Sequence, residues 1–319
     1  MSHDTLVLGV VGGGTRTMAW LAPMEADPTR QDESGVEQPL GDGESGGADP
    51  SFLGIDATLQ HLDEAISQAF EKAGIERAPV DAAVFALAGT EVEGRLSHYQ
   101  EWVEQHQIAR LTDVQNDASA TLAAGCPDGW GVALVAATGS IAFARSPDNV
   151  TGTAGGWGWL LGDEGSGFQI ALNGIGAAIH AYDGCGPQTA LMGAMLKAFN
   201  VQSPAELIRE VYNFPNNLRN ISAKAPVVTQ VAQDGDEVAK QIVRTGAKQL
   251  SLLVRSLISR PEFGWDEFPL AISGGAFRDS MMRSCVEAEL QSCGLSPQIQ
   301  HVPHVPAGAI LMARKLAEK

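Results

Sequence analysis

The sequence predicts an α/β fold, because buried strands alternate with helices along most of the chain. A second observation is that four apolar runs end in glycine turns, which read GGGT, LAGT, ATGS and ISGG. In open α/β sheets, ligands bind beyond the carboxyl ends of the strands, so such turns can line a binding site. With 319 residues, the chain is long enough for two domains or for one large one.

The first 150 residues supply most of the strands. Apolar, β-favouring runs predict strands at residues 5–11, 16–23, 81–89, 109–117, 130–140 and 141–145. Helical spacing and composition predict helices at residues 52–73, 91–106 and 118–125. The stretch 24–51 is acidic and rich in Gly, Pro and Ser, so it predicts a long, solvated loop.

The second half of the chain is first helical and then alternates again. Residues 166–260 predict a helical region with breaks near Gly184, Pro204 and Pro215. The expected elements after it are a strand at 268–275, a helix at 276–293, a strand at 297–302 and a helix at 306–318.

Composition and charge exclude several classes of protein. Hydrophobic residues make up 44% of the chain and charged residues 18%, which is ordinary for a well-cored globular protein. The formal net charge is −17, so we expect neither nucleic acid nor an anionic membrane as a main partner.

Cysteine usage and the N-terminal residues indicate the compartment. The four cysteines form no CxxC pair, which makes a zinc site improbable. The segment MSHDTLVLGVVGGG lacks the features of a signal peptide, and no apolar run is long enough for a membrane span. We therefore expect a cytoplasmic protein with reduced thiols.

The glycine turns suit phosphate binding. In GGGT (residues 12–15) and ATGS (residues 137–140), backbone N–H groups can close around phosphate oxygens, and Thr15 adds a hydroxyl. A plain β-hairpin is the alternative for each. Neither a Walker A loop nor a Rossmann GxGxxG is present. The glycines of ISGG allow either a flat ring against the backbone or close helix–strand packing.

Asp117 ends a predicted strand. A carboxylate there can accept the proton of an attacking hydroxyl, as phosphoryl transfer requires. It can also cap the following helix, and both roles can hold together.

The segment GGWGWLLGDEGSG (155–167) contains six glycines, two tryptophans and two adjacent acids. One explanation of the two acids is that they precede a helix, because acidic side chains are favoured at a helix N-terminus. It requires neither the tryptophans nor the glycines. Carboxylates beside indole rings hold sugars, because the acids accept hydrogen bonds from hydroxyls while the aromatic faces cover the C–H face. We therefore expect a sugar ring against this backbone.

A family resemblance covers nearly the whole chain. The motifs GVVGGGTRT, FALAGTE, VQNDASATLAAG, ALVAATGSIAFAR, AGGWGWLLGDEGSGFQIA and LAISGG occur in this order between residues 9 and 275. Together they resemble the BadF/BadG/BcrA/BcrD ATPase family in its N-acetylglucosamine kinase branch, and HVPHVPAGAILMARK is similar to its closing helix. The resemblance implies a two-domain actin/hexokinase-like (ribonuclease H-like) ATPase fold with a cleft between the domains.

The expected domains follow from this resemblance. They are an N-terminal α/β domain over residues 1–118 with the acidic loop 24–51, a C-terminal α/β domain over 119–305 with a helical insertion at 166–260, and a closing helix at 306–319 that packs back on the first domain.

The resemblance also implies roles for individual residues. ATP is implied to bind Gly13, Gly14, Thr15, Thr138, Gly139, Gly274 and Gly275. Asp117 is implied to be the base that accepts the proton of the sugar 6-hydroxyl. The sugar is implied to contact Asp49, Asp117, Gly156, Trp157, Gly158 and Asp163. Mg²⁺ is implied to bridge the phosphates, and we expect a homodimer.

Two positions depart from the family pattern. The family usually has an acid immediately before GGGT, implied to orient magnesium, where this chain has Val11. The metal ligands are therefore unassigned, or the role shifts to another acid such as Asp117. The family's sugar loop commonly has Asn where this chain has Asp49.

The resulting hypothesis is an amino-sugar kinase for N-acetylglucosamine, with Trp157 and Trp159 as an apolar wall for the acetyl methyl. A glucosamine kinase is the alternative, because Asp49 can pair with an ammonium group. Less favoured alternatives are an ATPase activase, which would need cysteines for an iron–sulfur cluster, and a non-catalytic sugar sensor.

Overall fold

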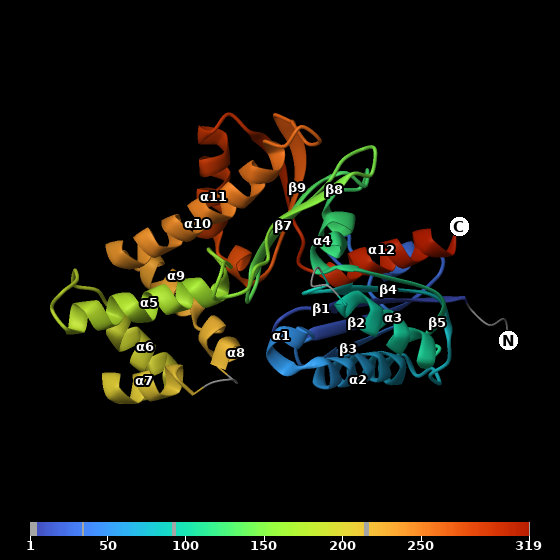
Figure 1. The fold of residues 1–319 in the computed structure, drawn as a ribbon, viewed down its shortest axis with the longest axis horizontal. Helices are drawn as coiled ribbons and strands as arrows, with labels where there is room; N and C mark the ends of the chain where they lie inside the picture. The colour runs from blue at the N-terminus through green and yellow to red at the C-terminus, as the bar shows by residue number, and fades with distance from the viewer. Residues whose placement is uncertain (1–4, 34, 91–93, 214–216, 319) are drawn as a thin grey trace. The chain divides into compact units, whose positions relative to one another are not determined.

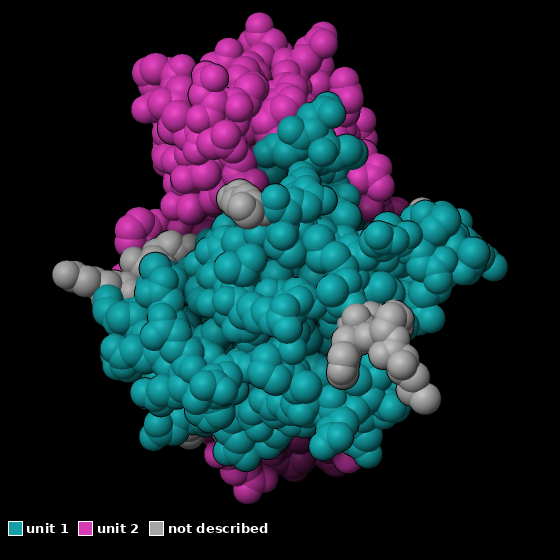
Figure 2. Space-filling model, turned by 90° about the vertical axis from the view of Figure 1, so that its right-hand side faces the viewer, with its two compact units in different colours: residues 1–129, 302–319 teal, residues 130–301 magenta. Residues whose placement is uncertain are grey.

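The computed structural model describes residues 5–33, 35–90, 94–213 and 217–318. The chain divides into two compact units, residues 1–129 with 302–319 and residues 130–301, which have separate colours in Figure 2. Each unit contains one five-stranded mixed sheet with helices (Figure 1), so the expected α/β class is confirmed. Among the described residues, no helix is long and apolar enough to cross a membrane.

The sheet of unit 1 has the order β3-β2-β1-β4-β5. Its strands are β1 (Leu6–Gly12), β2 (Thr17–Pro23), β3 (Gly41–Ser45), β4 (Val80–Leu87) and β5 (Ala109–Asn116). β1, β2 and β3 form an antiparallel meander, whereas β1, β4 and β5 are parallel. In register, Gly12 lies opposite Leu87 and Leu87 opposite Asn116, so the three parallel strands end side by side.

Helices cover both faces of this sheet (Figure 1). They are α1 (Pro50–Leu53), α2 (Ile55–Ala73), α3 (Arg95–Gln105), α4 (Asp117–Gly125) and α12 (Val305–Ala317), with a short 3₁₀ helix η1 (Pro28–Arg30). On one face, Leu62 of α2 and Tyr99 of α3 join the core. On the other, Ala120 of α4 and Ala309 of α12 pack against the strands.

The sheet of unit 2 repeats the same plan. Its order is β10-β9-β6-β7-β8, with strands β6 (Gly131–Ala136), β7 (Ser140–Arg145), β8 (Thr151–Gly155), β9 (Glu267–Ser273) and β10 (Ser296–His301). β6, β7 and β8 form the antiparallel meander, and β6, β9 and β10 are parallel.

Unit 2 also contains most of the helices. They are α5 (Gly167–Tyr182), α6 (Leu191–Phe199), α7 (Pro204–Val211), α8 (Asn217–Ser222), α9 (Ala225–Gln233), α10 (Glu237–Ile258), α11 (Ser280–Ser292) and the 3₁₀ helix η2 (Gly275–Arg278). In α10, Val243, Ala247, Leu250 and Val254 are fully buried at helical spacing. That apolar stripe holds α10 in the core of unit 2.

The structure corrects several expected elements. The solvated loop at 24–51 is wrong for residues 28–30, 41–45 and 50–51, which belong to η1, β3 and α1. The helix at 52–73 is interrupted at Gly54, and β8 was not expected at all. The helix at 276–293 is interrupted, because Asp279 caps α11 through the N–H of Met282. Residues 91–93 of the predicted helix at 91–106, and the predicted break at Pro215, lie outside the described residues.

Glycines explain why β3 was missed. A Cβ on Gly43 would lie 1.9 Å from the carbonyl oxygen of Ala65, and one on Gly41 would lie 2.1 Å from that of Ala69. These glycines let β3 pack directly on the backbone of α2. In the sequence they resemble loop residues, but their function here is close packing.

Unit 1 continues to Gly129, so it includes the whole of α4, whereas the boundary expected from the sequence lies after residue 118. The reason is the packing of α4 against α12. A Cβ on Gly308 of α12 would lie 1.9 Å from the carbonyl oxygen of Ala120 in α4. The two helices are therefore in backbone contact within unit 1.

Candidate functional site

The GGGT turn lies where β1 ends in unit 1. Gly13 donates its N–H to the carbonyl of Arg16 (3.0 Å), which closes the turn between β1 and β2. The carbonyl of Gly13 accepts the N–H of Ala48 (2.8 Å), and that of Gly12 accepts the N–H of Ala88 (2.8 Å). The GGGT turn, the segment before α1 and the LAGT turn therefore meet at one edge of the sheet.

Asp117 lies at the same edge, as the first residue of α4. The helix cap is its neighbour Asn116, whose side chain accepts the N–H of Ala118 (2.8 Å). The capping role considered for Asp117 is therefore wrong. Its partly exposed carboxyl group is at a helix N-terminus, where the helix dipole favours negative charge.

Asp49 is more constrained than its sequence context suggests. Its Oδ1 accepts the N–H of Ser51 (2.9 Å), which caps α1, and it lies 3.7 Å from Nη1 of Arg95. Nη1 of Arg95 also donates to the carbonyl of Gly89 in the LAGT turn (3.4 Å). Sequence reasoning missed Arg95, because nothing along the chain signals that α3 presents it to Asp49.

Tyr99 supports the backbone beside Asp49. Its buried hydroxyl donates to the carbonyl of Ala48 (3.4 Å). Burial raises the pKa of Tyr99, and the charge of Asp49 raises it further, against the opposing effect of Arg95. The tyrosine is therefore a neutral donor at this position.

In unit 2, the ATGS turn joins β6 to β7. The N–H of Ala137 donates to the carbonyl of Gly139 (2.9 Å) within the turn. The following segment binds the turn at several points: Gly167 N–H donates to the Ala137 carbonyl (2.7 Å), and Ser140 Oγ donates to the Glu164 carbonyl (2.9 Å). The GDEGSG segment is therefore attached to the ATGS turn.

Asp163 makes the central contact between the two segments. Its Oδ1 accepts the N–H of Ser140 (3.0 Å), and only 8% of the residue is exposed. A Cβ on Gly139 would lie 2.7 Å from Oδ2 of Asp163. The structure thus places this carboxylate against the ATGS turn, while its expected contact with a sugar stays a prediction.

The two tryptophans of the loop have different environments. Trp159 packs edge-on against Phe168, with ring centroids 5.8 Å apart, whereas Trp157 is 73% exposed. Gly156 and Gly158, on either side of Trp157, have φ angles of +75° and +82°, which glycine adopts easily. Of the two tryptophans, Trp157 is thus the one presented to solvent, and Leu160 and Leu161 of the same loop are also exposed.

The ISGG turn ends β9, beside the end of β6. Gly274 has a φ of +105°, and a Cβ there would lie 2.3 Å from the carbonyl oxygen of Ala136, so close packing explains this glycine. A Cβ on Gly275 would meet nothing within 4 Å. Gly275 therefore leaves open space near the end of β6, the strand that leads into the ATGS turn.

The described residues offer no cage for a metal. Within them, no group of three or more His, Cys, Asp or Glu side chains could hold a metal ion. Val11 is 7% exposed and belongs to an apolar cluster with Ala86 and Ala120. Any Mg²⁺ at this site would therefore be held chiefly by the ATP phosphates that it accompanies.

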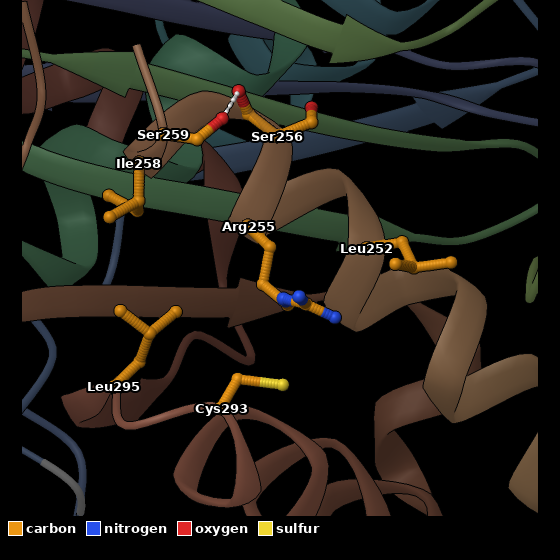
Figure 3. Close-up of a pocket in the computed structure, with 7 residues that line it drawn as sticks. All are labelled: Leu252, Arg255, Ser256, Ile258, Ser259, Cys293 and Leu295. Atoms are coloured by element: carbon orange, nitrogen blue, oxygen red, sulfur yellow. Dashed lines mark hydrogen bonds between the residues drawn. The ribbon is translucent and has the colours of Figure 1, made fainter. Parts of the chain in front are cut away.

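A separate hollow of about 400 Å³ lies in unit 2 (Figure 3). It is lined by the end of α10 and the connection from α11 to β10: Leu252, Arg255, Ser256, Ile258, Ser259, Cys293 and Leu295. None of the predicted site residues lines it, so it has no part in the proposed function.

Three curated proteins are similar in sequence. An N-acetylmuramic acid/N-acetylglucosamine kinase of Clostridium acetobutylicum is 28% identical over 68% of this chain and 71% of that protein. An N-acetyl-D-glucosamine kinase of Dictyostelium discoideum is 26% identical over 85% of each chain. The glucosamine kinase GspK of Vibrio cholerae is 24% identical over 78% of this chain and 79% of that protein.

The fold has a solved relative in a Chromobacterium violaceum protein assigned as an N-acetylglucosamine kinase. The TM-score is 0.76 at 24% identity, with 97% of this chain and 99% of that chain covered. This similarity confirms the actin/hexokinase-like fold. A family model for the BadF/BadG/BcrA/BcrD ATPases matches residues 8–313, which confirms the resemblance carried by the motifs. The protein belongs to the BadF/BadG/BcrA/BcrD ATPase family.

Proposed function

We propose that this protein is an ATP-dependent kinase that transfers the γ-phosphate of ATP to the 6-hydroxyl of N-acetylglucosamine. The observation that carries the proposal is the gathering of Asp117, the GGGT turn and the LAGT turn at one edge of the unit 1 sheet. The sequence similarity to curated amino-sugar kinases supports the same activity.

Backbone groups of two glycine turns bind the phosphates of ATP in this proposal. Gly13, Gly14 and Thr15 of the GGGT turn contact the phosphates, as do Thr138 and Gly139 of the ATGS turn. The N–H of Gly13 already donates to the Arg16 carbonyl, so the phosphates take the other backbone N–H groups of these turns as donors. The open space at Gly275 accommodates the adenosine, next to Gly274.

Asp117 is the base. Its carboxylate accepts the proton of the sugar 6-hydroxyl while the hydroxyl oxygen forms a bond to the γ-phosphorus. The bond from that phosphorus to the bridging oxygen breaks, and ADP leaves with its electron pair. Because this transition state needs little covalent help, positioning by the turns supplies most of the rate enhancement.

The proposed sugar contacts are Asp49 and residues of the GGWGWLLGDEGSG segment. Asp49 accepts hydrogen bonds from ring hydroxyls, and Gly156, Trp157, Gly158 and Asp163 are the contacts on unit 2. The exposed indole of Trp157 gives the acetyl methyl an apolar surface. Glucosamine is the second candidate, because Asp49 is an acid and because the chain resembles a glucosamine kinase.

The test is a sugar panel with the purified full chain, ATP and Mg²⁺, with ADP release as the readout. We expect kcat/KM for N-acetylglucosamine at least about tenfold above that for glucosamine and glucose, since a buried methyl supports discrimination of this order. A higher value for glucosamine selects the second candidate. ADP release that does not depend on any sugar overturns both.

Three further inferences accompany this activity. Turnover requires a divalent cation carried by the ATP phosphates, and excess chelator abolishes it. The protein is a homodimer, and its molar mass, measured by light scattering after size-exclusion chromatography, tests this directly. It acts in the cytoplasm, which fractionation of the source cells tests.

A further inference from the structure

Asp49 and Arg95 form a charge pair beside the proposed sugar site. Nη1 of Arg95 lies 3.7 Å from Oδ1 of Asp49, and the two side chains are 22% and 16% exposed. The same guanidinium nitrogen donates to the carbonyl of Gly89. Arg95 is therefore held between the segment that precedes α1 and the turn that follows β4.

The pair lies at the edge of the sheet where the proposed chemistry takes place. The N–H of Ala48, the neighbour of Asp49, donates to the carbonyl of Gly13 in the GGGT turn, and Gly89 lies two residues after the end of β4 at Leu87. β4 is paired with β5, whose end leads into Asp117. A sugar whose hydroxyl reaches Asp117 is therefore exposed to the electrostatic field of both Asp49 and Arg95.

The two candidate sugars differ in charge as well as in size. Glucosamine carries an ammonium group, whereas the acetamide of N-acetylglucosamine is neutral. A lone, partly buried carboxylate would attract the ammonium. A guanidinium within 4 Å of that carboxylate offsets the attraction, and it has no comparable effect on an acetamide.

We propose that Arg95 is a specificity-determining residue that makes the sugar site select a neutral N-acylated amino sugar over a cationic amino sugar, by compensating the charge of Asp49. This inference rests on the proposed function. It assigns a role to the acid at position 49 that is compatible with the acetylated substrate: Asp49 accepts hydroxyl hydrogen bonds without making the site anionic.

A charge series tests the inference, with the ratio of kcat/KM for N-acetylglucosamine to that for glucosamine as the readout. Arg95→Gln leaves the carboxylate of Asp49 uncompensated. That carboxylate attracts the ammonium of glucosamine, so the ratio falls by at least about fivefold. Asp49→Asn leaves it cationic, so the ratio rises. The double variant restores neutrality, and its ratio returns close to that of the wild type.

Two further variants separate charge from packing. Arg95→Lys keeps the cation and is expected to keep the wild-type ratio. Arg110→Gln is the matched control, because Arg110 pairs with Asp81 near the opposite ends of β4 and β5 and its side chain is 79% exposed.

The outcomes are distinct. If wild-type protein phosphorylates neither sugar, the proposed function fails. If it is active but Arg95→Gln lowers kcat/KM equally for both sugars, or Arg95→Lys shifts the ratio as much as Arg95→Gln, the specificity role is wrong. If Arg95→Gln does not fold, Asp49→Asn still decides, because an unchanged or lower ratio in that variant contradicts charge compensation.

Discussion

The carboxylate of Asp163 accepts a hydrogen bond from the backbone N–H of Ser140, with 3.0 Å between Oδ1 and N. This bond joins the loop that contains Trp157 to the turn that contains Thr138 and Gly139. The two segments were expected to serve different substrates, one the sugar and the other ATP. Their attachment means that a change in one alters the geometry of the other.

Asp163→Ala is therefore expected to weaken nucleotide binding even without sugar. The change leaves the Ser140 N–H without its acceptor, at a cost of about 1–3 kcal/mol, and places alanine at a φ of +60°. We expect ADP affinity to fall about tenfold in calorimetric titration, while Asp163→Asn, which keeps an acceptor, stays closer to the wild type. Unchanged ADP affinity with a raised KM for the sugar alone would show that the carboxylate serves only the sugar.

Asp117→Asn is expected to lower kcat by about 10²-fold or more and to leave the KM for the sugar largely unchanged. The amide cannot accept the hydroxyl proton, but it keeps the size of the side chain. Asp113→Asn is the matched control, since Asp113 belongs to β5 but precedes its end by three residues. Turnover near the wild-type rate in Asp117→Asn overturns the assignment of the base.

Arg314 attaches α12 to the acidic segment that follows β2. Its guanidinium makes two hydrogen bonds to the carboxylate of Glu37 (2.7 and 2.9 Å) and donates to the carbonyl of Pro23. Arg314→Ala leaves Glu37 without its partner and lowers the free energy of unfolding by about 3–5 kcal/mol, as measured in urea. Arg77→Ala is the control, because its pair with Asp63 is more exposed, and it costs about 1 kcal/mol or less.

The same pair gives unit 1 a stability that depends on pH. Burial raises the pKa of Glu37, but hydrogen bonds from Arg314 and the Asp27 N–H outweigh it, and the net pKa lies below the ordinary 4.5. A lowered folded-state pKa stabilises the fold above pH 4.5, and this contribution disappears as the pH falls through the folded-state value. Urea titrations below pH 4.5 are expected to show this loss in the wild type, whereas Glu37→Gln lacks it. If the free energy of unfolding falls equally steeply with decreasing pH in the two proteins, the prediction is wrong.

Gly43→Ala tests the packing of β3 on α2. Its Cβ would lie 1.9 Å from the carbonyl oxygen of Ala65, so the strand must shift, and we expect a loss of about 1–3 kcal/mol. Gly176→Ala is the control, because a Cβ there meets nothing within 4 Å and the residue lies inside α5. Hydrogen exchange is expected to show protected amides in residues 41–45, and rapid exchange there would support the solvated loop that the sequence predicts.

The sequence predicts the central strands well, and the reason is physical. β1, β4 and β6 are almost wholly buried, so they are continuous apolar runs, and each ends in a glycine turn. The same turns contain the residues proposed to bind the nucleotide. Strand β3, GDGES, has no such pattern, because it forms only through its pairing with β2 and its contact with α2.

The site could be predicted only where a motif is local. Asp117 and the glycine turns lie at strand ends, which sequence patterns locate. The contact of Arg95 with Asp49 joins residues 46 positions apart, and the contact of Asp163 with Ser140 places a carboxylate under a turn instead of in solvent. Both depend on tertiary packing that no spacing in the sequence encodes.

The position of α12 in the chain constrains how the protein matures on the ribosome. This helix fills the core of unit 1 with Ala309, Ile310 and Ala313, and a Cβ on Gly9 of β1 would lie 2.8 Å from the backbone N of Ile310. Yet α12 is synthesised only after all of unit 2. A nascent chain can therefore complete unit 2 while the strands of unit 1 still lack their last helix. Unit 1, whose strands are translated first, cannot complete its packing until the residues after 301 have been translated.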